Sequence, residues 1–456
     1  MSHTMRRRKR SLRIAWLWRR VGWSVLLAAL VMSGDVVQAT EPLSYEPDRT
    51  RDVPWLLGDW NGRRVWLQDR GLDLQLGYTG EFAFNATGGV RPQAAYADQY
   101  LAGATFDLER LAGFKGMTFQ VTVTARTGRN LSDDASMGTL QQVQEIYGRG
   151  QTLRLTQLWV NQRLFSGRID WKLGRMTFGE DFASFPCEFE NLTFCGAAPG
   201  NLVPGYIYNW PVSQWATRLR YNIDGFGYVQ AGAYDVNPQY ASTNDTLLPV
   251  FFKGSTGVLI PIELTWLPRL AGGLPGSYKI GAWYDTSAVN DVVSDINGNP
   301  YVLTGLRPRR QQGRAGGYLG IVQQLTPLAA WETRRGLNVF LNAVVASDRS
   351  STTDNQVAAG LVYTGPFRSR PDDDVGFAVG MTRVNSRIAA SQALANSLGL
   401  GPVAVQGAEF PFELHYTFRP VNGLLFRPSI QYVINPGGTG ANPNALVFGF
   451  TTSINF

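Results

Sequence analysis

The side chains best suited to bind a solute in this sequence are arginines and carboxylates that stand at alternate positions among threonine, serine and glutamine. Arginine far outnumbers lysine after residue 39, and its planar guanidinium offers five donors that suit paired hydroxyls or carboxylates. The candidates on the polar phase of the alternation are Glu81, Arg126, Lys172, Arg218, Arg220, Glu413 and Arg427. Arg175 is a further candidate because it ends a strand that leads into the segment of the two cysteines. Acids and bases opposed across water would orient polar, uncharged solutes while keeping the net field small. Each residue could equally be a solvated or salt-bridged position without solute contact.

One aromatic side chain is a further binding candidate, and the scarcity of histidine argues against catalysis. The indole of Trp283 could stack on the C–H bonds of a ring or pack against a plug. His415 is the single histidine after residue 39, so sites that need several histidines are excluded, and a triad could draw on one imidazole. We therefore predict no catalytic residue, metal site or cofactor. A membrane-bound hydrolase with His415 as base is a remote alternative.

The two cysteines, Cys187 and Cys195, both follow the segment that we interpret below as an export signal. In an oxidising compartment an even pair indicates a disulfide rather than a redox or metal site. The segment around them is long and rich in aromatic residues. Two arrangements remain open: the segment folds inward as a constriction, or it stays outside as a protected external loop.

Residues 1–39 have the order of a cleaved signal peptide. Eight basic residues and one acid precede or flank the apolar stretch Val21 to Met32, and Val37-Gln38-Ala39 forms a small-x-small cleavage site. This segment accounts for the whole formal net charge of +7, so the remaining chain is neutral. The chain after residue 39 therefore has no excess of positive charge to attract phosphates, which argues against nucleic-acid binding.

After residue 39 the chain repeats segments of about ten residues in which apolar and polar side chains alternate. In Leu72 to Phe84, leucine, tyrosine and phenylalanine share one face, and in Met117 to Arg126 apolar residues oppose threonine, glutamine and arginine. A period of two is typical of β-strands. Sixteen such segments are present, and no uncharged apolar run is long enough for a membrane-spanning helix.

A secreted β-sandwich would show the same alternation with its apolar face inward. Three features favour the opposite arrangement with the apolar face in lipid: the export signal, aromatic residues at segment ends, and a final amphipathic strand that ends on Phe456. The predicted fold is therefore an all-β transmembrane antiparallel barrel of about 16 strands, with long extracellular loops. A barrel of this size leaves an aqueous channel.

The predicted organisation has three parts. A signal peptide at 1–39 precedes an N-terminal periplasmic or plug segment at 40–71, and the barrel pore occupies 72–456. Asp59 to Gly71 has an acidic N-cap and a glycine stop, which predicts a short helix. The alternative is an irregular lead-in to the first strand.

Four stretches, taken together in their order and spacing, carry a family resemblance. They are Leu57-Gly58-Asp59-Trp60-Asn61-Gly62, Gly174-Arg175-Met176 with Asp181-Phe182, Cys187 to Gly196, and Phe426 to Gly438. The chain resembles the carbohydrate-selective porins, the OprB-like porins of Gram-negative bacteria, from about residue 50 to 456. One departure is Phe450-Thr451-Thr452, where the family pattern leads us to expect an arginine.

The resemblance implies a sixteen-stranded outer-membrane porin for passive diffusion of monosaccharides such as glucose. The expected partners are small sugars, outer-membrane lipid and the barrel assembly machinery, which would act through the strand ending at Phe456. Association into a homo-oligomer stays open. A general-diffusion or anion porin is the main alternative function.

Overall fold

The computed structural model describes residues 55–242, 252–270, 272–327 and 335–456. The predicted signal peptide at 1–39 lies outside these residues. The described chain forms an antiparallel barrel whose strands are β1 (Leu72–Thr87), β2 (Ala94–Asp107), β3 (Met117–Gly128), β4 (Leu153–Leu164), β5 (Ile169–Met176), β6 (Gln214–Ile223), β7 (Gly227–Val236), β8 (Gly257–Trp266), β10 (Leu274–Asp295), β11 (Pro308–Gln324), β12 (Gly336–Ala346), β13 (Thr353–Thr364), β14 (Asp374–Val384), β15 (Ala408–Val421), β16 (Leu424–Ile434) and β17 (Ala445–Asn455). The two-residue strand β9 (Arg269–Leu270) only pairs with the start of β10. The prediction of sixteen barrel strands is confirmed.

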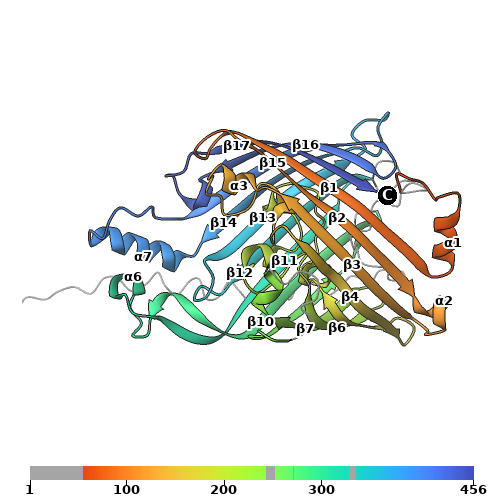
Figure 1. Ribbon diagram of the computed structural model, residues 1–456, viewed down its shortest axis with the longest axis horizontal. Coiled ribbons are helices and arrows are strands. Elements are labelled where there is room, and N and C mark those ends of the chain that lie inside the picture. The colour runs from red at the N-terminus through yellow and green to blue at the C-terminus, as the bar shows by residue number, and fades with distance from the viewer. Residues whose placement is uncertain (1–54, 243–251, 271, 328–334) are drawn as a thin grey trace, which may run out of the picture. The chain divides into compact units, whose positions relative to one another are not determined.

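Each strand pairs with its neighbour in the chain, and β1 pairs with β17 to close the barrel (Figure 1). In this seam Tyr78 lies opposite Ile454, and Phe84 lies opposite Phe448. Among the described residues, closure gives each of the sixteen barrel strands a partner on both sides, so the backbone polar groups of the barrel wall can be satisfied without water.

The two faces of the barrel follow the alternation of the sequence. In β8, Ile260, Ile262 and Leu264 are exposed on the outside, whereas Glu263 and Thr265 are buried on the inside. The outer face is thus apolar and suited to lipid, and the inner face is polar and covered by other parts of the chain.

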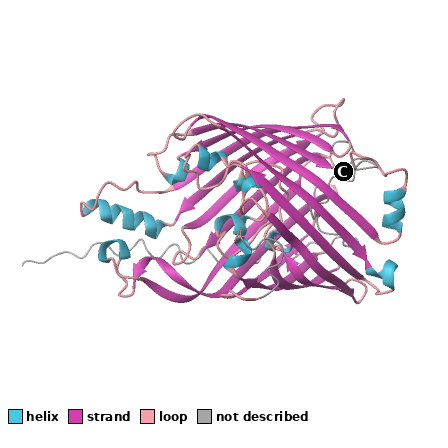
Figure 2. Cartoon of the chain, in the orientation of Figure 1, coloured by secondary structure: helices cyan, strands magenta, loops and turns pink. Residues whose placement is uncertain are grey.

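The two ends of the barrel differ in the length of their connections (Figure 2). One end carries short turns, the helix α2 (Leu108–Ala112) and the C-terminus. The other, the long-loop end, carries α6 (Tyr301–Thr304) and α7 (Ser386–Ser397). Among the described residues, no helix has both the length and the apolar character needed to cross a membrane.

The short N-terminal helix α1 (Arg63–Asp69) lies at the short-turn end, beside the start of β1 (Figure 1). Its Arg64 is buried, donates to the carbonyl oxygens of Leu74 and Phe456, and stacks over the ring of Trp55 at 3.9 Å. These contacts tie the segment before the barrel to the closing strands.

Candidate pore constriction

Two connections at the long-loop end turn back into the barrel. The β3–β4 loop, residues 129–152, contains α3 (Leu131–Asp134) and η1 (Glu145–Tyr147). The β5–β6 loop, residues 177–213, contains α4 (Phe178–Asp181), η2 (Leu192–Phe194) and α5 (Ala198–Leu202). Most residues of both loops are at least half-buried. They occupy the lumen and narrow the path through it.

The β5–β6 loop crosses the lumen to the opposite wall. The backbone N–H groups of Glu190 and Asn191 donate to the two carboxylate oxygens of Glu413 on β15, each at 2.8 Å. Asn191 Nδ2 also donates to Gln431 on β16, and the ring of Phe189 contacts His415 at 4.7 Å between centroids. The inward arrangement of this loop, left open by the sequence, is therefore the one observed.

The near end of the same loop is held by a cluster of charges around Asp181. Lys172 Nζ lies 3.0 Å and Arg218 Nε 3.2 Å from the Asp181 carboxylate, and Arg220 approaches to 4.0 Å. The adjacent cations hold the pKa of Asp181 well below its usual range, despite its burial. Lys172, Arg218 and Arg220, predicted as pore-lining residues, thus anchor α4 to β5 and β6.

The β3–β4 loop is fastened to the other side of the wall. Ile146 N donates to Glu81 Oε2 at 3.1 Å, and Arg126 Nη1 donates to the carbonyl of Gly148 at 2.6 Å. The two loops also bind each other, because Glu145 N donates to the carbonyl of Glu190 at 2.9 Å. The lumen is bridged from β1 and β3 to β15 by one continuous set of contacts.

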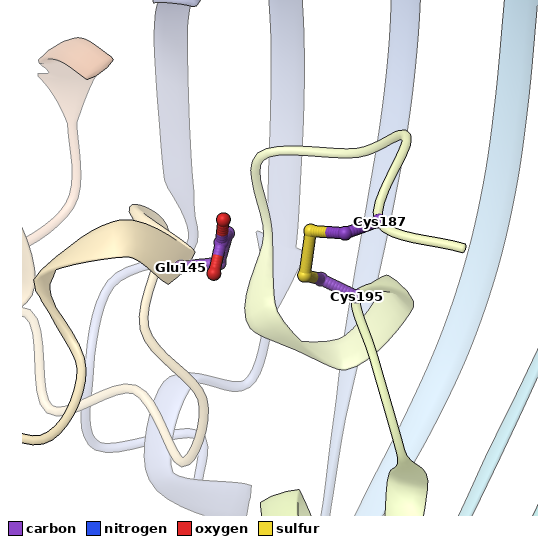
Figure 3. Close-up of side chains that lie close together, drawn as sticks. All are labelled: Glu145, Cys187 and Cys195. Atoms are coloured by element: carbon purple, nitrogen blue, oxygen red, sulfur yellow. A yellow bond between two sulfur atoms is a disulfide. The ribbon is translucent and has the colours of Figure 1, made fainter. Parts of the chain in front are cut away.

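Glu145 stands where the two loops meet, with its carboxylate beside the Cys187–Cys195 disulfide (Figure 3). The carboxylate oxygen and both sulfurs lie within 4.8 Å of one another. Since the sulfurs are bonded to each other, they are not thiolate metal ligands. The observed bond confirms the predicted disulfide, which closes the tip of the β5–β6 loop.

The carboxylate of Glu145 accepts no hydrogen bond from the described residues but lies in the field of two guanidiniums. Burial raises the pKa of Glu145, and the positive charges of Arg126 on β3 and Arg427 on β16 oppose that rise. Half-buried Glu188 is also near Arg427; burial and Asp374 raise the pKa of Glu188 to about 7. We name Arg126, Glu145, Glu188 and Arg427 the constriction cluster.

The remaining predicted residues lie apart from this cluster. Arg175 donates to the hydroxyl and carbonyl oxygens of Ser213 at 3.1 and 2.8 Å and stacks over Tyr240. Trp283 Nε1 donates to the hydroxyl of Tyr206 at 3.1 Å, inside an apolar cluster that joins the wall to the β5–β6 loop. Both side chains therefore pack against structure that fills the lumen.

Sequence reasoning missed Glu145 and Glu188 as members of the site. Glu188 lies within the stretch Cys187 to Gly196 that carries the family resemblance, and attention to its charge could have found it. Glu145 lies in an irregular loop with no period and no motif, so the sequence carried no signal for it.

The disulfide leads to a direct chemical prediction. Alkylation of the protein after denaturation without reductant is expected to label neither Cys187 nor Cys195, because an oxidising compartment preserves the bond. Mass spectrometry of protein extracted from outer membranes provides the measurement, and a reduced sample is the positive control. Two labelled thiols without reductant would contradict the prediction.

Comparison with known proteins places these features in a family. Residues 91–456 match the family described as carbohydrate-selective porin, OprB family. Porin B of Pseudomonas aeruginosa is 40% identical over 445 residues, which cover 94% of this chain and 96% of that protein. The putative porin QuiX of Acinetobacter baylyi is 33% identical over 452 residues, covering 94% of this chain and 98% of its own.

Solved structures agree with the sequence relatives. The structure of Pseudomonas putida OprB at high pH superposes with a TM-score of 0.85 at 40% identity, covering 89% of this chain and 99% of that one. The low-pH structure of Pseudomonas putida OprB has a TM-score of 0.57 at 30% identity and covers 88% of this chain and 98% of its own.

Proposed function

Because this chain belongs to the carbohydrate-selective porin, OprB family, we propose that its constriction cluster selects neutral monosaccharides such as glucose. The protein is an outer-membrane channel for passive sugar diffusion and not an enzyme. Arg126 and Arg427 would donate to sugar hydroxyls, and Glu145 would accept from them.

The observation that carries this proposal is the uncommitted carboxylate of Glu145 between the fields of Arg126 and Arg427. A carboxylate close to guanidiniums limits the net charge of the passage while leaving donors and acceptors for a neutral solute. Each hydrogen bond to a hydroxyl replaces one to water and contributes only about 0.5 to 1.5 kcal/mol. Binding is therefore weak enough for the sugar to leave.

The other predicted site residues support the cluster indirectly. Glu81, Glu413, Lys172, Arg218 and Arg220 hold the two loops against the wall. Arg175 and Trp283 pack against the β5–β6 loop or its return to β6. We propose that these residues determine the position of the constriction and that the cluster contacts the sugar.

We also propose that the barrel assembly machinery recognises β17. Phe448 and Phe450 are exposed on its outer face, and the chain ends at Phe456 one residue beyond the strand. An outward aromatic row is accessible to a protein partner before the barrel closes against β1. We propose separately that finished barrels associate into a homo-oligomer, which cross-linking in intact membranes would test.

Replacing Arg427 by alanine is expected to weaken glucose block of the single-channel current. Loss of one hydrogen bond of about 0.5 to 1.5 kcal/mol corresponds to a change of roughly 2-fold to 13-fold in the glucose dissociation constant. Planar-bilayer recordings with titrated glucose measure this constant, and Arg126→Ala should act in the same direction.

The matched control is Arg168→Ala, since Arg168 lies in a short turn and its side chain is 63% exposed. Unchanged glucose block in both Arg126→Ala and Arg427→Ala, with normal folding shown by heat-modifiable gel mobility, would reject the proposed contacts. A reversal potential that shows strong anion selectivity would instead favour an anion porin.

A further inference from the structure

A polar cavity of about 490 Å³ lies at the long-loop end, lined by residues outside the constriction cluster. Three segments contribute: the extended β10–β11 hairpin, the turn between β12 and β13, and the first turn of α7. Its lining residues are Asp291, Ser294, Gly298, Arg309, Arg310, Gln311, Asp348, Arg349 and Arg387. The volume falls within the range of about 300 to 1,000 Å³ typical of small-molecule sites.

Arg387 ties the three segments together. Its Nη2 donates to both carboxylate oxygens of Asp291, at 2.9 and 3.1 Å, and to Ser294 Oγ at 2.8 Å. Its Nη1 donates to the carbonyl of Asp348 at 3.2 Å. The charge of Arg387 is therefore balanced by Asp291, and the pair forms a fixed part of the cavity wall.

The other three arginines of the cavity are not balanced in this way. Arg309, Arg310 and Arg349 are exposed, and among the described residues none of their guanidiniums has a hydrogen-bond or ion-pair partner. The carboxylate of Asp348 is the remaining negative charge in the lining. Three positive charges against one negative charge leave a local excess of two.

We propose that this cavity binds a sugar phosphomonoester. A phosphomonoester carries about −1.5 to −2 charges at neutral pH, which matches the local excess. Guanidiniums bind phosphate oxygens through paired, charge-assisted hydrogen bonds. The amide of Gln311 and the hydroxyl of Ser294 are then available to sugar hydroxyls.

Other ligand classes fit the charge of the cavity less well. A neutral sugar would leave the local excess of two positive charges unbalanced, and a monocarboxylate would balance only one of the two. The phosphomonoester has two sources at the cell surface: the phosphorylated sugar headgroup of an outer-leaflet lipid, or a soluble sugar phosphate near the pore mouth. The chemistry of recognition is the same for both.

Binding to the purified full-length porin in detergent tests the proposal. Isothermal titration at about 0.15 M salt, where exposed charges are screened over about 8 Å, would use glucose 6-phosphate and glucose as probes. We expect glucose 6-phosphate to bind at least tenfold more tightly than glucose. The double variant Arg309→Ala with Arg349→Ala should weaken that binding at least tenfold.

Arg91→Ala is the matched control, because Arg91 is exposed in the β1–β2 connection at the same end of the barrel. Its affinity for glucose 6-phosphate should equal that of the unmodified protein. Native mass spectrometry with lipid A and with dephosphorylated lipid A distinguishes the source. A preference for the phosphorylated lipid that the double variant loses identifies a headgroup site, whereas a preference for glucose 6-phosphate alone identifies a soluble ligand.

Two results would overturn the proposal: no preference for the phosphorylated form of either probe, or equal binding by the double variant and the unmodified protein. Heat-modifiable gel mobility confirms that the double variant is folded. Glucose block of the channel should be unchanged in it, because Arg309 and Arg349 lie outside the constriction cluster. Absence of phosphate-dependent binding at this cavity would therefore not contradict the sugar selectivity proposed for the constriction cluster.

Discussion

Replacing Asp181 by alanine is expected to destabilise the protein more than any other single change considered. The substitution leaves Lys172, Arg218 and Arg220 buried or half-buried around an empty position. Removing one partner of a buried ion pair costs about 3 to 5 kcal/mol. Because Glu180 still pairs with Lys172 and Asp170 with Arg218, we expect about 3 kcal/mol, measured as a lower midpoint of urea or heat unfolding by gel mobility.

Asp224→Ala is the control for this experiment. Asp224, in the β6–β7 turn, pairs with Arg168, in the β4–β5 turn, and both side chains are more than 60% exposed. Exposed pairs contribute about 0 to 1 kcal/mol. An Asp181→Ala barrel with the same unfolding midpoint as the Asp224→Ala barrel would show that the charge cluster does not hold the loop.

Acidification gives an independent check on Asp181. Its pKa is lowered in the folded protein, so its stabilising effect is complete above the pKa of the unfolded carboxyl, about 3.9. That contribution is lost as the pH falls from there toward the lowered folded pKa. The difference in unfolding midpoint between the Asp181→Ala and unmodified proteins should therefore be constant near neutral pH and shrink below about pH 4.

Replacing Glu413 by alanine is expected to open the channel. The substitution removes the acceptor for the backbone N–H groups of Glu190 and Asn191, and each buried donor left without a partner costs about 1 to 3 kcal/mol. Water or a shift of the β5–β6 loop must then satisfy these groups. We expect higher single-channel conductance and weaker glucose block, recorded in planar bilayers.

Glu109→Ala provides a control of the same chemistry. The Glu109 carboxylate accepts from the N–H of Gly116 at 2.8 Å at the exposed short-turn end, where water can replace it. Its conductance should match that of the unmodified channel. Equal conductance in Glu413→Ala would show that the loop remains in place without this anchor.

The sequence alone determined the barrel and its orientation to lipid. Alternation with a period of two is a local property, and it marked Leu72 to Phe84 and Met117 to Arg126 as strands with one apolar face. The predicted export signal and the final amphipathic strand to Phe456 then favoured a lipid-facing barrel over a sandwich. The structure confirms the strand count. Apart from the closing pair of β1 with β17, each barrel strand pairs with its neighbour in the chain, so the sequence order gives almost all of the pairing.

The site was decided by the tertiary structure. Residues Glu190 and Glu413 are 223 positions apart, and their contact depends on where a loop lies inside the closed barrel. Alternation placed Arg126 and Arg427 in the lumen, but it carried no signal for Glu145, whose loop has no repeating pattern. Alternation also could not separate the arginines that face the passage from those, such as Arg218, that bind Asp181. Both kinds of arginine point inward from strands, and only the positions of the two folded loops decide which of them can meet a solute.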